Sequence, residues 1–112
     1  MQSADPRWSD VDDYIVEHLI GEDSALDACL AANAAAGLPS IDVSITQGRM
    51  LELLDRANRA QNILEIGTLG GYSAIFLARG LGEGGKLVTL ELEPDYAAVA
   101  RQNIENAGLS DK

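Results

Sequence analysis

Residues that could bind a charged ligand are concentrated in one glycine-rich segment, Glu65–Gly71 (EIGTLGG). This segment follows the short apolar run Ile63–Ile66 and precedes residues with helical spacing, which predicts a strand, a turn and a helix. Gly67 permits a sharp turn off the strand, and Gly70 and Gly71 remove side chains where the backbone must approach a ligand or the helix must approach the strand. The N–H groups that open the helix, together with the hydroxyl of Ser73, favour an anion. The pattern therefore indicates a ligand-binding turn.

A second candidate, Glu91, lies near the end of the next apolar run, Lys86–Leu92. The ends of neighbouring parallel strands lie side by side, and an acid there can accept both hydroxyls of a ribose. Glu65 stands where the dinucleotide fingerprint G-x-G-x-x-G has its first glycine, and a carboxylate repels a pyrophosphate. A ligand with both an amino group and a carboxylate, such as the methionine part of S-adenosylmethionine, suits the two anchor points better.

Helices must position these residues. Apolar residues over 9–20 recur at helical spacing, with Ser9 or Asp10 as the expected cap and Gly21 as the end. A second helix is expected from about residue 23 to Ala36, ended by Gly37. Residues 41–45 alternate between apolar and polar side chains, which predicts either a strand or an extended approach to a third helix.

The third helix is expected to be capped by Ser44 or Thr46. Its expected inward residues are Met50, Leu51, Leu53, Leu54 and Ala57, and its expected outward residues are Arg49, Glu52, Asp55, Arg56 and Arg59. The second half of the chain then predicts a strand over 63–66, a helix over 72–81, a strand over 86–92 and a helix over 94–107. This is a right-handed crossover unit.

Composition narrows the function classes. The 112 residues carry 18 acids against eight Lys and Arg, a net charge of −10, which argues against nucleic acid as a partner. The single cysteine, Cys29, precludes an intrachain disulfide and reads as a small packed hydrophobe. The chain shows neither an apolar run of roughly 18 residues nor a signal-peptide pattern, so we expect no membrane span and a cytoplasmic protein.

The segments ILEIGTLGGYSAIFLARGL and KLVTLELEPDYAAVARQNIENAGL resemble class I S-adenosylmethionine-dependent O-methyltransferases of the catechol and caffeoyl-coenzyme-A type. The resemblance covers residues 41–112. It implies an α/β, Rossmann-like doubly wound methyltransferase fold, truncated here to N-terminal helices and the first β-α-β-α unit. Residues 1–61 would form an N-terminal helical segment, and residues 62–112 the first half of the domain that binds S-adenosylmethionine.

The same resemblance implies the roles of individual residues. Glu65 would line the methionine pocket, Ser73 would bond the methionine carboxylate, Glu91 would hold the ribose hydroxyls, and Val43 would touch the methionine end through its backbone. The full set of implied cofactor-binding residues is Val43, Glu65, Gly67, Thr68, Gly71, Ser73 and Glu91.

The implied reaction is methyl transfer to a hydroxyl of a small catechol- or phenylpropanoid-like acceptor, assisted by a Mg-type divalent cation, in a protein that can form homodimers. Family members run to about twice this length, so we expect neither catalytic residues nor metal ligands here, and a fragment that is inactive alone. Two apolar strands with open edges would leave it marginally stable or oligomeric. The alternatives are a non-catalytic interaction module, a tRNA hydroxyuridine methyltransferase and an NAD-dependent oxidoreductase.

Overall fold

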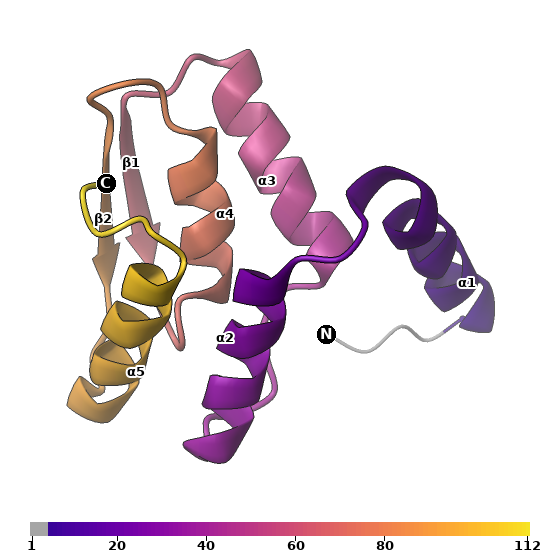
Figure 1. Cartoon of the computed structure of the whole chain (residues 1–112), viewed down its shortest axis with the longest axis horizontal. Helices are drawn as coiled ribbons and strands as arrows, with labels where there is room; N and C mark the ends of the chain where they lie inside the picture. Colours follow the sequence, from indigo (N-terminus) through magenta and orange to yellow (C-terminus); the bar gives the residue numbers. More distant parts are fainter. Residues whose placement is uncertain (1–4) are drawn as a thin grey trace.

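Helical segments come first along the chain, and two strands then alternate with two further helices, in a computed structural model that describes residues 5–112 (Figure 1). The elements in order are α1 (Pro6–Ile15), the π-helical turn η1 (Val16–Ile20), α2 (Ser24–Ala35), α3 (Ile45–Ala57), β1 (Asn62–Ile66), α4 (Tyr72–Gly80), β2 (Lys86–Leu90) and α5 (Pro94–Asn106). None of the helices within residues 5–112 is long and apolar enough to cross a membrane.

The two strands form a parallel sheet, and α4 is the crossover between them (Figure 1). In this register Glu65 of β1 stands opposite Thr89 of β2. The expected β-α-β-α unit is confirmed, with each strand somewhat differently bounded: β1 begins at Asn62, and β2 ends at Leu90. Glu91 is therefore the first residue beyond its strand.

The core is built around α4. Its residues Ile75 and Phe76 are completely buried, and the ring of Tyr72 meets that of Phe76 edge-on, with 5.4 Å between the ring centroids. Leu26 and Cys29 of α2 complete this cluster, each only 1% exposed. Because α4 follows the glycine-rich turn directly, burying this helix fixes the turn against the rest of the chain.

The sheet is covered on one face. The alternate side chains Leu64, Ile66, Val88 and Leu90 are between 50% and 81% exposed, whereas the residues between them face the helices and are partly buried. Both strands are thus mainly apolar on the open face, and within residues 5–112 nothing packs over it. The division between residues 1–61 and 62–112 remains a prediction. In the structure α3, which precedes this boundary, packs directly on α4, which follows it.

The N-terminal helices differ in detail from expectation. The start predicted at Ser9 is wrong: α1 begins at Pro6, and the carboxylate of Asp5 caps it by accepting the Arg7 N–H. Proline suits this position because its fixed φ matches a first helical turn and the missing N–H is not needed there. The predicted start and end of α2 are confirmed, with Asp23 as its cap.

The approach to α3 is extended, and no strand forms at residues 41–44. Ser44 caps α3 by accepting the Gln47 N–H, and the Gln47 side chain returns a bond to the Ser44 N–H. Thr46 is therefore not the cap. Its hydroxyl instead donates to Asp12 of α1 at 2.9 Å.

The predicted faces of α3 are wrong in one respect that matters for packing. Glu52, expected outward, is 3% exposed, whereas Met50, Leu53 and Leu54, expected inward, are 51% to 56% exposed. The cause is a close crossing of α3 over α4 at glycines. A Cβ on Gly48 would lie 2.3 Å from the Phe76 ring, so only a glycine admits that ring.

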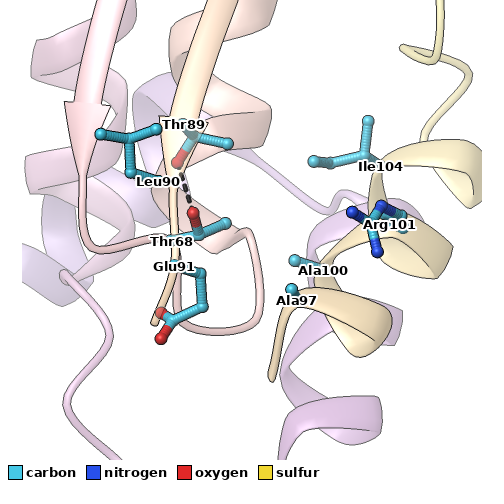
Figure 2. A pocket seen from close by; sticks show the side chains of 8 residues that line it. All are labelled: Thr68, Thr89, Leu90, Glu91, Ala97, Ala100, Arg101 and Ile104. Atoms are coloured by element: carbon cyan, nitrogen blue, oxygen red, sulfur yellow. Dashed lines mark hydrogen bonds between the residues drawn. The ribbon is translucent and has the colours of Figure 1, made fainter. Parts of the chain in front are cut away.

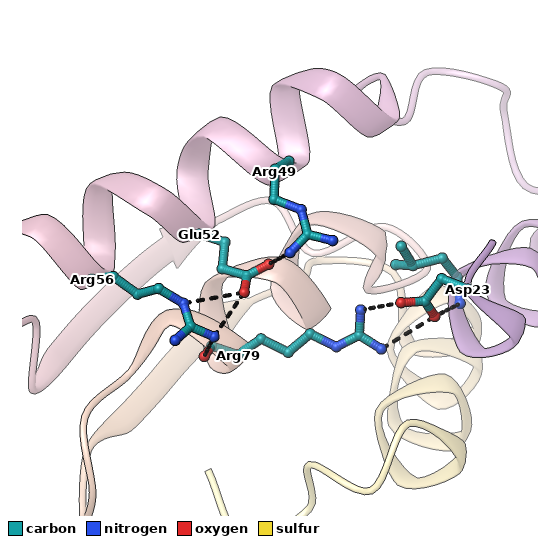
Figure 3. A network of polar contacts seen from close by, with 6 residues as sticks. Asp23, Arg49, Glu52, Arg56 and Arg79 are labelled. Atoms are coloured by element: carbon teal, nitrogen blue, oxygen red, sulfur yellow. Dashed lines mark hydrogen bonds and ion pairs between the residues drawn. The ribbon is translucent and has the colours of Figure 1, made fainter. Parts of the chain in front are cut away.

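Glu52 can be buried because two arginines of its own helix neutralise it (Figure 3). The guanidinium of Arg49 lies 2.9 Å from one carboxylate oxygen, and that of Arg56 lies 2.9 Å from the other. Figure 3 also shows Arg79 of α4 paired with Asp23. The guanidinium and the carboxylate lie 2.7 Å apart, and the pair ties the start of α2 to α4. The Asp23–Arg79 pair thus joins two helices, whereas both pairs of Glu52 lie within α3.

Candidate functional site

A cleft of about 340 Å³ opens beyond the carboxyl ends of the two strands. One wall is the glycine-rich turn with the start of α4, and the opposite wall is the segment that leads into α3. The lining residues are Pro39, Ile41, Asp42, Val43, Gly67, Thr68, Leu69, Tyr72, Ser73, Glu91 and Tyr96. The strand ends converge here because parallel strands joined by a crossover finish at the same edge of the sheet.

Glu65 is held by two hydroxyl groups. Ser73 Oγ donates to Glu65 Oε2 at 2.6 Å, and Thr89 Oγ1 donates to Glu65 Oε1 at 2.7 Å. Thr89 Oγ1 also lies 2.6 Å from Thr68 Oγ1 (Figure 2). Since the single hydroxyl proton of Thr89 goes to Glu65, Thr68 must be the donor in that second bond. The result is a directional chain that ends on the carboxylate.

Glu91 is held by backbone N–H groups. Its Oε1 accepts the Leu69 N–H at 2.7 Å, and its Oε2 accepts the Glu93 N–H at 3.0 Å. The bonds from Glu93 and then Leu69 lower the pKa of the Glu91 carboxyl, because they favour its charged form. Each carboxylate oxygen keeps a further lone pair for a ligand donor.

The backbone of the turn is bent at glycines and at one residue that is not a glycine. Gly67 and Gly71 have φ of +92° and +87°, which side chains disfavour, and Leu69 has φ of +53°. The N–H groups of Gly67 and Thr68 donate to the Leu90 carbonyl oxygen at 2.8 and 3.2 Å. These two amides secure the turn to β2, so they are engaged within the protein rather than directed at the cleft.

The structure brings most of the predicted site residues together. Five of the seven line the cleft: Val43, Gly67, Thr68, Ser73 and Glu91. Glu65 reaches it through Ser73. Gly71 does not line the cleft; it lies behind the turn, where an added Cβ would lie 3.4 Å from Ala100 of α5. What favours glycine at this position is its φ of +87°, and its part in cofactor binding remains a prediction.

Thr89, Tyr96 and Tyr72 line or support the cleft, and none of them was among the predicted site residues. Thr89 links Glu65 to Thr68, and its signal is the strand register, which sets it opposite Glu65. Tyr96 lines the cleft from the first turn of α5, a position that follows from its closeness to Glu91 in the sequence. Tyr72 is 3% exposed, and burial raises its pKa to about 12, yet it also borders the cleft.

The cleft is acidic. Asp42 and Glu91 are in its lining, Glu65 stands behind Ser73, and the lining contains neither lysine nor arginine. Such a site favours a ligand that carries positive charge and hydroxyl donors, and it disfavours a pyrophosphate. Within residues 5–112 no group of three His, Cys, Asp or Glu side chains lies together as a metal site would require.

Comparison with known proteins identifies the family of the chain. The sequence profile of the family described as O-methyltransferase matches residues 17–112. The chain is 52% identical over 107 residues to a catechol O-methyltransferase of Mycobacterium tuberculosis, covering 96% of this chain and 49% of that protein. It is 50% identical to a catechol O-methyltransferase of Niastella koreensis, covering 92% and 47% respectively.

Among solved structures, the O-methyltransferase from Bacillus cereus in complex with SAH superposes with a TM-score of 0.93 at 56% identity, over 95% of this chain and 48% of that one. The match confirms the Rossmann-like methyltransferase fold. The chain spans about half the length of the curated relatives it matches. With the family profile covering most of its residues, the chain belongs to the O-methyltransferase family.

Proposed function

We propose that this chain is the cofactor-binding part of an S-adenosylmethionine-dependent O-methyltransferase. The observation that carries the proposal is the acidic cleft at the strand ends, where Ser73 and Glu91 face the same space and each is oriented by the surrounding fold. The relative from Bacillus cereus is in complex with SAH, the demethylated form of this cofactor, which supports the same ligand class here.

The residues present fit such a cofactor. Glu65, beside Ser73, offers a negative charge to the methionine amino group, and Ser73 offers a hydroxyl to the methionine carboxylate. Glu91 offers carboxylate lone pairs to the ribose hydroxyls, and the backbone near Val43 and Thr68 borders the methionine end. When bound, S-adenosylmethionine supplies a methyl group on a positively charged sulfur. The part of this chain is to bind and orient it.

For the whole protein we propose transfer of that methyl group to a hydroxyl of a small, catechol-like acceptor. The catechol O-methyltransferases among the relatives support this substrate class. A divalent cation, a homodimeric assembly and a cytoplasmic location also belong to this proposal. The residues that the structure describes do not provide a ligand set for the cation.

Calorimetric titration of S-adenosylmethionine into the chain tests the cofactor site. Glu91→Ala should weaken binding by about tenfold or more, because it removes the acceptor for two hydroxyls. Glu93→Ala is the matched control, since it deletes a neighbouring carboxylate and retains the Glu93 N–H that Glu91 accepts. Binding that NAD displaces, or that both variants weaken equally, would contradict the proposal.

Activity separates the enzyme from a non-catalytic interaction module. A chain of the relatives' length should methylate a catechol in the presence of Mg²⁺, and it should lose the activity with Glu91→Ala. The 112-residue chain should bind the cofactor without transferring the methyl group. A relatives-length chain that binds the cofactor yet methylates no catechol would favour the interaction module or another acceptor.

A further inference from the structure

Two asparagines meet in the interior behind the glycine-rich turn. Asn33 of α2 and Asn103 of α5 are each 3% exposed, and their helices lie side by side (Figure 1). Asn103 Nδ2 donates to Asn33 Oδ1 at 3.0 Å and to the carbonyl oxygen of Gly70 at 2.8 Å. The turn that forms one wall of the cleft is thus bonded to α5.

The same pair reaches the opposite wall of the cleft. Asn33 Nδ2 donates to Asp42 Oδ1 at 3.2 Å, and Asp42 belongs to the segment that lines the cleft beside Val43. The thiol of Cys29 adds a weaker bond to the Gly70 carbonyl oxygen at 3.6 Å. A continuous bridge therefore runs from Gly70 through Asn103 and Asn33 to Asp42.

The bridge has one consistent direction. An ionised Asp42 only accepts hydrogen bonds, so Asn33 must present its amino group to Asp42 and its carbonyl oxygen to Asn103. Asn103 must then donate to both Asn33 and Gly70. Contact is so close that a Cβ on Gly70 would lie 1.9 Å from Asn33 Oδ1. The side-chain amide of Asn33 therefore limits how closely the glycine-rich turn can approach α2.

Buried amides are costly unless they are bonded, and apolar side chains would fill the same space without that requirement. A fully bonded polar pair between helices specifies one relative placement of the groups that it joins. Here those groups are the two walls of the cleft.

We propose that Asn33 and Asn103 are positioning residues that hold the Asp42–Val43 segment at a fixed separation from the glycine-rich turn, and thereby set the affinity for the cofactor. The second half of this statement rests on the proposed function, whereas the first half concerns the chain alone. Neither asparagine lines the cleft, so both act through the residues that they bond.

The test is a swap of two side chains. Asn33→Asp directs a second carboxylate at Asp42 and removes the donor between them, while it can still accept from Asn103. Asn33→Asp combined with Asp42→Asn restores a donor and an acceptor, with the net charge of the wild type. Asn106→Asp, the same change at an exposed site on α5, is the matched control.

Two measurements are made on each variant. Hydrogen exchange without ligand reports the backbone at residues 41–43 and 69–71, and calorimetry reports binding of S-adenosylmethionine. We expect Asn33→Asp to accelerate exchange in both segments and to weaken binding by about tenfold. The double variant should restore exchange and should bring binding to within about threefold of Asp42→Asn alone, because Asp42 lines the cleft and its charge there is lost in both. Asn106→Asp should change neither exchange nor binding.

Unchanged exchange in Asn33→Asp, or a double variant no better than the single one, would overturn the bridge. Restored exchange without restored binding would overturn its role in affinity. A wild-type chain that does not bind S-adenosylmethionine would refute the proposed function, yet the exchange data would still decide whether the bridge holds the two walls.

Discussion

Replacing Thr89 by valine removes one hydroxyl and leaves the shape of the side chain almost unchanged. That hydroxyl donates to Glu65 at 2.7 Å and accepts from Thr68 at 2.6 Å. The variant therefore breaks the chain of bonds that orients Glu65 and leaves Ser73 as its remaining hydroxyl donor in this network.

The magnitude follows from the two bonds. A bond to a charged acceptor contributes about 1.5–3 kcal/mol, and one between neutral hydroxyls about 0.5–1.5 kcal/mol. Glu65 and Thr89 are only partly buried, so water compensates for part of the loss. We expect the free energy of unfolding to fall by about 2 kcal/mol, which for a chain of this size lowers the melting temperature by about 8 °C.

Thermal melts and cofactor titration of three variants check this expectation. Thr89→Ser keeps the hydroxyl and should bind S-adenosylmethionine nearly as the wild type does, whereas Thr89→Val should bind several-fold more weakly. Thr46→Val loses a similar bond to a carboxylate, that of Asp12, far along the chain from the turn. It should lower stability without weakening binding. The reasoning is refuted if Thr89→Val melts and binds like the wild type, or if Thr46→Val weakens binding equally.

Three further outcomes are expected. Gly70→Ala should lower the free energy of unfolding by about 3 kcal/mol in a urea melt, because its Cβ would collide with Asn33; a loss under about 1 kcal/mol would show that the turn can shift. The hydrogen bond from Arg79 lowers the pKa of Asp23, so on acidification the Asp23 carboxyl takes up its proton at a higher pH in the unfolded chain than in the folded one. The stabilisation that this pair gives the folded chain is therefore fully present above the ordinary pKa of 3.8, and it is lost as the pH falls through the lowered value. Arg79→Met should accordingly flatten the acid limb of a plot of melting temperature against pH, and an unchanged limb would contradict that assignment. Burial raises the pKa of Cys29 to about 11, so the thiol should react slowly with a disulfide reagent at pH 8 until denaturant is added; fast labelling of the folded chain would show that α2 opens.

Much of the fold could be predicted from local patterns. Apolar runs of strand length, the glycines at 67 and 71 and the proline at the start of α5 are each local signals, and they predicted the order strand, helix, strand, helix. The start of α2 near Asp23, and Ser44 as one of two possible caps of α3, were predicted in the same way, because a capping side chain bonds the backbone only two or three residues ahead.

The predictions were wrong where contacts with residues far along the chain determine which face of a helix is buried. An apolar stripe on α3 predicted that Leu53 and Leu54 face inward, but the close approach at Gly48 turns the opposite side of the helix toward α4. Glu52 is buried there because Arg49 and Arg56 cancel its charge. Helical periodicity cannot report a crossing that depends on the backbone of another helix.

The same distinction applies to the site. By itself the sequence predicted the glycine-rich turn and an acid at the end of the second strand, because glycine conformation and strand alternation are properties of a few adjacent residues. Only the tertiary structure decided that Thr89 orients Glu65, that Leu69 fixes Glu91, and that a buried amide pair joins the two walls of the cleft. Each of these bonds joins residues 22 to 70 positions apart, so strand register and helix packing had to bring them together first.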